Sequence, residues 1–127
     1  IEASQDQEIE IIAIEEEVEE GPLLFFLVED KPSFQGGGPE DFRTYIMSNV
    51  TYPRIAMENG ISGTVHVTFV VDKTGNYSNL KIQRGVDPSL DNAVIDAIKK
   101  APKWKPGAQR GKPVPVSMSI PIRFVLN

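Results

Sequence analysis

The sequence contains no cysteine and only one histidine, His66. Disulfides, thiolate metal sites and cysteine nucleophiles are therefore excluded, while the cellular compartment is left open. His66 has Thr64 and Thr68 as same-face neighbours, without the serine and aspartate spacing of a catalytic triad, which argues against an enzyme. It has no second strong ligand nearby, and the acidic residues lack the spacing of a calcium loop. We expect neither a metal nor a cofactor.

Long hydrophobic runs are also missing. The longest wholly apolar run is Leu23 to Val28, far shorter than the ~20 residues that span a bilayer. The sequence begins with Ile1 instead of methionine and shows no signal-peptide pattern. We therefore expect a membrane anchor or export signal to be absent from this chain.

Basic residues are absent from residues 1–30, which hold eleven acidic ones. The net charge of −5 is therefore −11 in this part and +6 in the rest. Such a split predicts an acidic flexible spacer over 1–22, a lead-in over 23–38 with a possible edge strand at Leu23 to Val28, and a folded domain over 39–127. The basic residues of the domain are scattered, with only Trp104 among them, so we expect no nucleic-acid binding.

The stretch from Thr64 to Arg84 predicts a β-hairpin. Apolar side chains alternate from Val65 to Val71, which is typical of a strand with one face in a core. A turn ending at Gly75 then leads into a half-buried return strand with Leu80 and Ile82 on its apolar face.

Three helices are expected around this hairpin. The first begins at Pro39 with acidic residues in its first turn, and a short second helix follows Tyr52-Pro53 and stops at Asn59-Gly60. The third begins at Asp87-Pro88 and ends at Pro102, with an apolar face that should cover the sheet. Trp104 should pack on this helix, and Gly107 to Pro113 should form a basic surface loop.

The last segment alternates over thirteen residues, with Val114 to Leu126 apolar at every even position. Pro115 and Pro121 have no N–H to donate, so the odd-numbered backbone groups should face away from the sheet. The helical crossover from the return strand requires a parallel strand on the far side of the central one. We predict an α+β two-layer sandwich: a three-stranded mixed sheet of order 2-1-3, covered by helices, with a possible extra N-terminal strand.

An ordered set of short motifs resembles the C-terminal domain of the TonB family over about residues 32–127. The branch with a Pro-x-Phe-x-Gly-Gly lead-in is matched by Pro32, Phe34, Gly36 and Gly37. The other motifs are Tyr52-Pro53 with Ala56, Gly63-x-Val65-x-Val67-x-Phe69-x-Val71-Asp72-x-x-Gly75, Leu90-Asp91-x-Ala93, Trp104-x-Pro106, Gly111-x-Pro113-Val114 and Pro121-Ile122-x-Phe124.

The resemblance implies the periplasmic domain of a single-pass inner-membrane protein that transduces energy in Gram-negative bacteria. A missing N-terminal membrane helix would join a proton-driven motor of the ExbB and ExbD kind. The domain would grip the TonB box of an outer-membrane transporter and drive import of siderophores, vitamin B12 or glycans. The acidic stretch departs from the family's usual proline-rich spacer, although a like-charged spacer would also be extended. The alternative is a TonB-like extracytoplasmic sensor domain of a signalling protein.

An exposed strand edge can bind a peptide by strand addition, and we expect the last strand to be such an edge. Its backbone groups at Ser117, Ser119 and Arg123 should pair with the TonB box, with a gap at Pro121. A homodimer is also possible. The charged residues of the loop before this strand should attract acidic groups around the TonB box. Alternatively, these charges only keep the domain soluble. The candidate partner-binding residues are Val116, Ser117, Met118, Ser119, Ile120, Pro121, Ile122 and Arg123 on the strand, with Gln109, Arg110 and Lys112 on the loop.

Overall fold

A computed structural model of the protein describes residues 21–126. The predicted acidic spacer lies outside the described residues, apart from its last two positions. The chain runs through β1 (Leu23–Leu24), a 3₁₀ turn η1 (Phe25–Leu27), α2 (Pro39–Asn49), α3 (Arg54–Glu58), β2 (Gly63–Val71), β3 (Tyr77–Arg84), α4 (Pro88–Lys99), β4 (Gly107–Gln109), β5 (Lys112–Val114) and β6 (Val116–Phe124).

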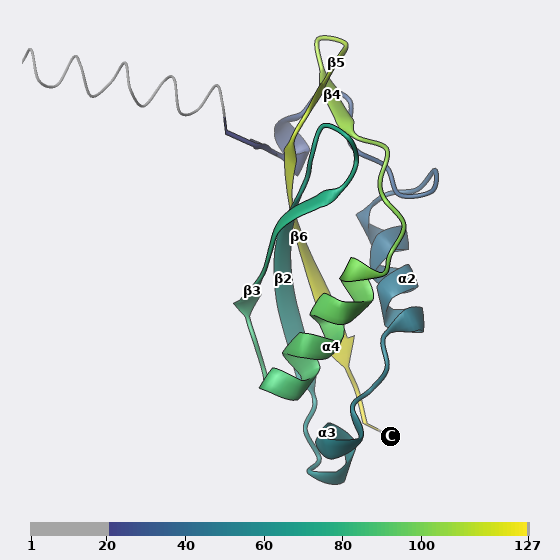
Figure 1. The fold of residues 1–127 in the computed structure, drawn as a ribbon, viewed down its shortest axis with the longest axis vertical. Coiled ribbons are helices and arrows are strands. Elements are labelled where there is room, and N and C mark those ends of the chain that lie inside the picture. Colours follow the sequence, from purple (N-terminus) through teal and green to yellow (C-terminus); the bar gives the residue numbers. More distant parts are fainter. Residues whose placement is uncertain (1–20, 127) are drawn as a thin grey trace, which may run out of the picture.

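The main sheet has the order β1-β6-β2-β3 (Figure 1). Both β3 and β6 are antiparallel to the central β2, so the crossover through α4 joins two parallel strands. The predicted order of three strands is confirmed. β1 adds a fourth strand, parallel to β6, in which Leu23 and Leu24 pair with Val116 and Ser117.

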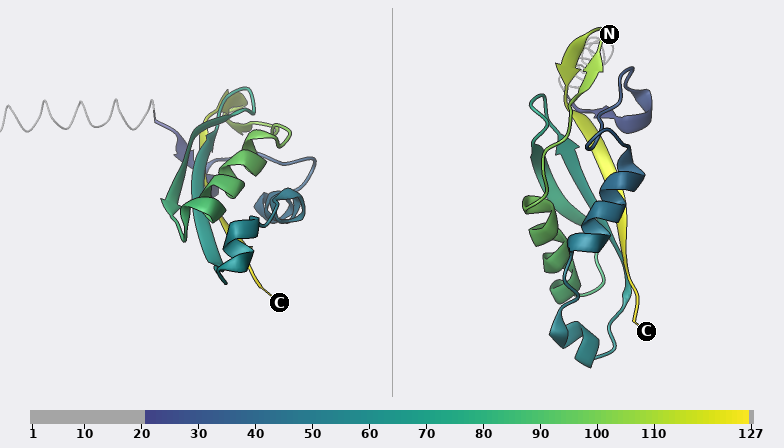
Figure 2. Two further views of the ribbon diagram at one scale, coloured as in Figure 1. Left: turned by 60° about the horizontal axis from the view of Figure 1, so that its bottom comes forward. Right: turned by 90° about the vertical axis from the view of Figure 1, so that its right-hand side faces the viewer.

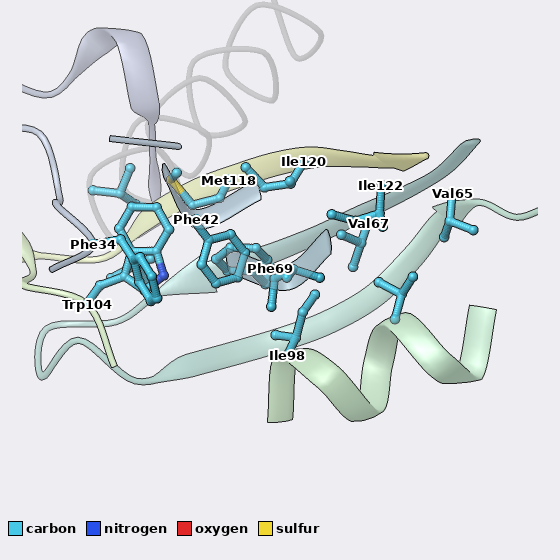
Figure 3. Packing of buried hydrophobic residues seen from close by; sticks show 14 of the residues in the cluster. Phe34, Phe42, Val65, Val67, Phe69, Ile98, Trp104, Met118, Ile120 and Ile122 are labelled. Carbon is cyan, nitrogen blue, oxygen red and sulfur yellow. The ribbon is translucent and has the colours of Figure 1, made fainter. Parts of the chain in front are cut away.

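The helices lie on one side of this sheet, which gives the predicted two-layer α+β fold (Figure 2). The odd positions of β2 and the even positions of β6 are buried against them, as their alternation predicts. Leu90, Val94 and Ile98 of α4 are fully buried in the same core. Figure 3 shows Ile98 pointing from the helix toward the sheet. The opposite face of the sheet carries no α-helix among residues 21–126.

An aromatic cluster fills one end of the core and explains the lead-in motif. Gln35 and Gly36 both have positive φ, and paired backbone bonds between Phe34 and Gly37 close a tight turn that turns Phe34 inward. The Phe34 ring lies 5.0 Å from Phe42 of α2 and 5.6 Å from Trp104, between ring centroids. The indole, which we predicted to pack on the third helix, belongs to the same core cluster as that helix and also lies against the rings of Phe34, Phe42 and Phe69.

The turn between β2 and β3 fits against the backbone of Trp104. Gly75 has a φ of +87°, and a Cβ there would approach the Trp104 carbonyl oxygen to 1.9 Å. The Trp104 N–H donates to the Gly75 carbonyl at 2.9 Å. Glycine is therefore required here both by φ and by space. Two motifs far apart in the sequence thus form one contact.

The helix ends follow the local signals. Asp87 caps α4 by accepting a hydrogen bond from the Ser89 N–H at 3.0 Å, and Pro88 takes the first helical position. Asp41 accepts from the Gly38 N–H at 2.9 Å at the start of α2. Tyr52 donates its hydroxyl to the Ile61 carbonyl and packs edge-on against Phe124, so it joins the α3 region to the end of β6.

Two local predictions are wrong. Gly107 to Pro113 is a hairpin of β4 and β5 instead of a loop, and Asp30 pairs with Ala108 on its flank. The last strand is interrupted at Pro115, so that Val114 belongs to β5 and β6 begins at Val116. The hairpin closes locally, since Gln109 pairs with Lys112 across a turn in which Arg110 and Gly111 both have positive φ. Of the predicted edge strand at Leu23 to Val28, only the first two residues pair as a strand, Phe25–Leu27 form η1, and Val28 is buried.

Candidate functional site: the outer edge of the last strand

The outer edge of β6 carries backbone groups directed away from β2. Pro121 lies opposite His66, and it has no N–H to place in the ladder with β2. Because antiparallel positions alternate, the N–H and C=O groups of Ser119 and Arg123 face outward like those of Pro121. The Pro115 carbonyl shows the same direction, since it accepts from the Leu23 N–H at 3.0 Å.

β1 covers the first part of this edge. Leu23 and Leu24 pair with Val116 and Ser117, two residues that we predicted to bind a partner strand. A partner could pair there only after displacing β1. Beyond Ser117, β6 has no strand neighbour on its outer side among residues 21–126. The open stretch is therefore Met118 to Phe124.

The side chains of the open stretch alternate between the core and solvent. Ser119, Pro121 and Arg123 are exposed, whereas Met118, Ile120 and Ile122 are buried. The three buried residues from the predicted site thus hold the strand in place. A bound strand would contact the backbone and the three exposed side chains.

The predicted loop residues lie on the β4–β5 hairpin, next to the β1 end of β6. Arg110 and Lys112 are exposed at its tip, but the Gln109 side chain accepts a hydrogen bond from the Glu29 N–H at 2.8 Å. Arg123 lies at the other end of β6, seven residues from Val116, or about 23 Å at the usual rise of a strand. The charged residues of the predicted site therefore do not form one cluster, because Arg110 and Lys112 lie near one end of β6 and Arg123 lies near the other.

A groove on the open face of the sheet was not found from the sequence. It has a volume of about 690 Å³, and its lining includes Thr68, Val70 and Lys81 together with Leu24 and Phe26 from the β1–η1 segment. Leu24 is 48% exposed and Phe26 is 70% exposed. The apolar run of residues 23–28 was the available signal, because such a run seldom stays in water.

The shifted pKa values belong to structural groups. Hydrogen bonds from Thr74, whose hydroxyl has the largest effect, lower the pKa of Asp72 in the β2–β3 turn. Hydrogen bonds from Ser89 lower the pKa of Asp87 at the cap of α4. Burial raises the pKa of Tyr77, whose hydroxyl donates to the Pro102 carbonyl at 2.7 Å. None of these groups lies on the outer edge of β6.

Within residues 21–126, no group of three or more His, Cys, Asp or Glu residues is arranged to hold a metal ion. His66 lies on the open face of the sheet, between Pro121 and Arg84 on the neighbouring strands. No helix in the described part of the chain is long and apolar enough to cross a membrane.

Comparisons with known proteins agree on one family. Residues 48–126 match the model of the Gram-negative bacterial TonB protein C-terminal family. Protein TonB of Vibrio cholerae is 40% identical over 78 residues, which is 60% of this chain and 31% of that protein. Protein TonB of Helicobacter pylori is 31% identical over 86 residues, covering 67% of this chain and 29% of the relative. The chain thus matches about a third of the length of these relatives.

Solved structures give the same result. The NMR structure of the Helicobacter pylori TonB C-terminal domain, residues 179–285, superposes with a TM-score of 0.56 at 28% identity. The superposition covers 69% of this chain and 79% of that one. A shorter structure of the same domain, residues 194–285, gives a TM-score of 0.51 at 27% identity and covers 68% of this chain and 90% of that one.

Proposed function

Because this chain belongs to the TonB C-terminal family, we propose that it is the periplasmic domain of an energy transducer that binds the TonB box of an outer-membrane transporter. Binding takes place by strand addition to the outer edge of β6, from Met118 to Phe124. The observation that carries this proposal is a regular strand whose outward backbone groups have no partner among residues 21–126. Such an edge is a known site of peptide recognition.

The spacing of donors along this edge sets the register of the bound strand. Ser119 and Arg123 offer outward N–H groups, whereas Pro121 between them offers only its carbonyl. A partner strand therefore meets two donors with a gap, and a register shifted by one residue loses them. Because the paired strands run side by side, a pull along them loads the hydrogen bonds together. This suits a domain that transmits force.

Charges along the edge favour acidic groups next to the bound motif. Arg123 lies on the strand itself, and Arg110 and Lys112 are exposed on the hairpin beyond β1. Exposed charges mainly change association rate and specificity, so they contribute less than the backbone pairing. Gln109 contributes by holding the lead-in at Glu29.

The remaining parts of the proposed system lie outside this chain. In the proposal, a membrane helix joins the domain to an inner-membrane motor of the ExbB and ExbD kind. The acidic segment of residues 1–22 acts as a charged spacer between them. The transducer then delivers work from the proton gradient to the transporter for nutrient import. The domain itself needs no catalytic residue or cofactor for this role.

The proposal is tested by Ser119→Pro, measured by calorimetry with a TonB-box peptide. The substitution removes an outward N–H, which has no partner within the described sheet, so the domain should stay folded. The lost hydrogen bond contributes about 0.5–1.5 kcal/mol, and the proline ring also blocks the approach of the partner. Affinity should fall roughly tenfold, since about 1.4 kcal/mol corresponds to a factor of ten.

The matched control is Ser119→Ala, which removes the hydroxyl and keeps the N–H. It should bind the peptide like the unmodified chain. Unchanged affinity in a folded Ser119→Pro protein would rule out edge pairing. Analytical ultracentrifugation of the same proteins would separate peptide binding from pairing of this edge with a second copy.

A further inference from the structure

The open face of the sheet has an unusual charge distribution. The four strands contain no aspartate or glutamate at all, while they carry Lys81, Arg84 and Arg123. Lys81 lines the groove on this face, where Val70 is 8% exposed and Thr68 and Ser117 are partly exposed. Leu24 and Phe26 form an apolar wall of the same groove. The groove therefore suits an occupant with apolar side chains and negative charge.

The chain itself contains a segment with this chemistry next to the groove. Residues 8–20 hold seven glutamates and no basic residue, and the apolar residues among them are Ile9, Ile11, Ile12, Ala13, Ile14 and Val18. The segment joins the described structure through Gly21 and Pro22, and Pro22 lines the groove. Thirteen residues can extend over about 43 Å, which exceeds the length of β6 at about 30 Å.

We propose that residues 8–20 fold back on their own domain and dock in the groove on the open face of the sheet. The isoleucines contact Leu24, Phe26 and Val70, and the glutamates lie near Lys81 and the arginines of the face. The short tether makes the event intramolecular, with an effective concentration in the millimolar range, so even weak docking is well populated.

The docked segment also regulates the proposed peptide site. Ser117 and Ser119 line the groove, and Ser119 is the first outward donor of the open edge of β6. A segment lying over them competes with a partner strand. This consequence rests on the proposed function, whereas the docking itself does not. Tension on the chain would release the segment, which could then act as the extended spacer that its composition predicts.

Because the chain contains no cysteine, a single spin label can report the docking. The full chain of residues 1–127 carries Ile12→Cys with a nitroxide, and paramagnetic broadening of backbone amides is measured by NMR. Amides of Thr68 and Lys81 on the open face should broaden strongly. Amides of Val94 in α4, behind the opposite face, should not. Equal broadening at both faces would overturn the proposal.

A matched control separates docking from mere proximity of the tether. The same labelled chain carries Ile9→Ser, Ile11→Ser and Ile14→Ser, which keep the length and every charge. The proposal predicts that broadening at Thr68 and Lys81 falls several-fold in this chain. Unchanged broadening would show that the label is near the groove only because it is attached there.

Two further measurements locate the contact and its consequence. Lys81→Glu should reduce the broadening several-fold, whereas Lys73→Glu in the β2–β3 turn should not. The chain with serines at positions 9, 11 and 14 should bind the TonB-box peptide several-fold more tightly than the unmodified chain. If no chain binds the peptide, the proposed function fails while the spin-label result still decides the docking.

Discussion

The two edges of the main sheet are both exposed strands, but they are built differently. β6 keeps a continuous register with β2 over nine residue pairs, from Val116 to Phe124. β3 loses its register with β2 at two places, and Asn79 in its middle has a φ of +50°. Irregular, twisted and charged edges resist the addition of another strand. The β3 edge is therefore protected, and the β6 edge is open to a partner.

The comparison of β3 with β6 shows how a strand edge without a neighbour can still limit which strands pair with it. Pro121 removes an outward donor from β6, Pro115 lies just before the strand, and β1 covers the first two residues of β6. Uncontrolled pairing is limited because a new strand must match the two remaining donors, Ser119 and Arg123. In this sheet, β3 is protected by irregularity and β6 by Pro121 and a short covering strand. Under the proposed function, only the second form of protection leaves an edge to which a partner strand can add.

The largest expected effect comes from removing the core that supports both edges. Phe69 is 1% exposed, and its ring lies 5.4 Å from Phe42 and 5.2 Å from Tyr77, between centroids. Phe69→Ala should lower the free energy of unfolding by about 3–5 kcal/mol, measured by urea titration. Val125→Ala, at an exposed position, should change it by less than about 0.5 kcal/mol. A loss below about 1 kcal/mol for Phe69→Ala would contradict the burial of this ring.

A smaller effect tests the irregular edge. Asn79 adopts a left-handed conformation that a β-branched residue accepts poorly. Asn79→Val should destabilise the domain by roughly 1–2 kcal/mol, whereas Asn79→Gly should be almost neutral. Thermal unfolding of the two variants provides the measurement. If valine and glycine gave equal stability, β3 would be a regular strand, and the distinction between the edges would fail.

The smallest effect concerns the turn that attaches β3 to β2. Asp72 accepts hydrogen bonds from the N–H groups of Thr74 and Asn76 at 2.9 and 3.0 Å and from the Thr74 hydroxyl at 2.6 Å. These bonds lower the pKa of Asp72 in the folded state below its ordinary value of 3.8. Its stabilising contribution is therefore present above about pH 4 and is lost as the pH falls through the folded pKa.

Asp72→Asn should therefore make the free energy of unfolding less dependent on pH between about pH 5 and pH 2. Urea titrations of both proteins across this range provide the test. The carboxylate of Asp72 is only partly shielded from solvent, which makes the effect a small one. Identical pH profiles would show that the turn hydrogen bonds do not distinguish the charged carboxylate.

Much of this architecture followed from local patterns in the sequence. The alternation in β2 and β6, the Asp87-Pro88 helix start and the Gly75 turn were predicted because each depends on residues close together in the chain. The strand order also followed, since a helical crossover permits few topologies. The prolines in the last segment also predicted which of its backbone groups face outward, because a proline has no N–H to donate to a neighbouring strand.

The tertiary structure alone decided which parts of that edge are covered. Leu23 and Leu24 pair with β6 across more than ninety residues, and Asp30 pairs with Ala108 on the flank of the β4–β5 hairpin. Trp104 likewise packs with Phe34 and Phe42, which belong to distant segments. Such pairings depend on which surfaces meet after the core has formed, and no local periodicity encodes them. The sequence determined that an edge would exist, and the packing of the lead-in decided that its open part begins at Met118.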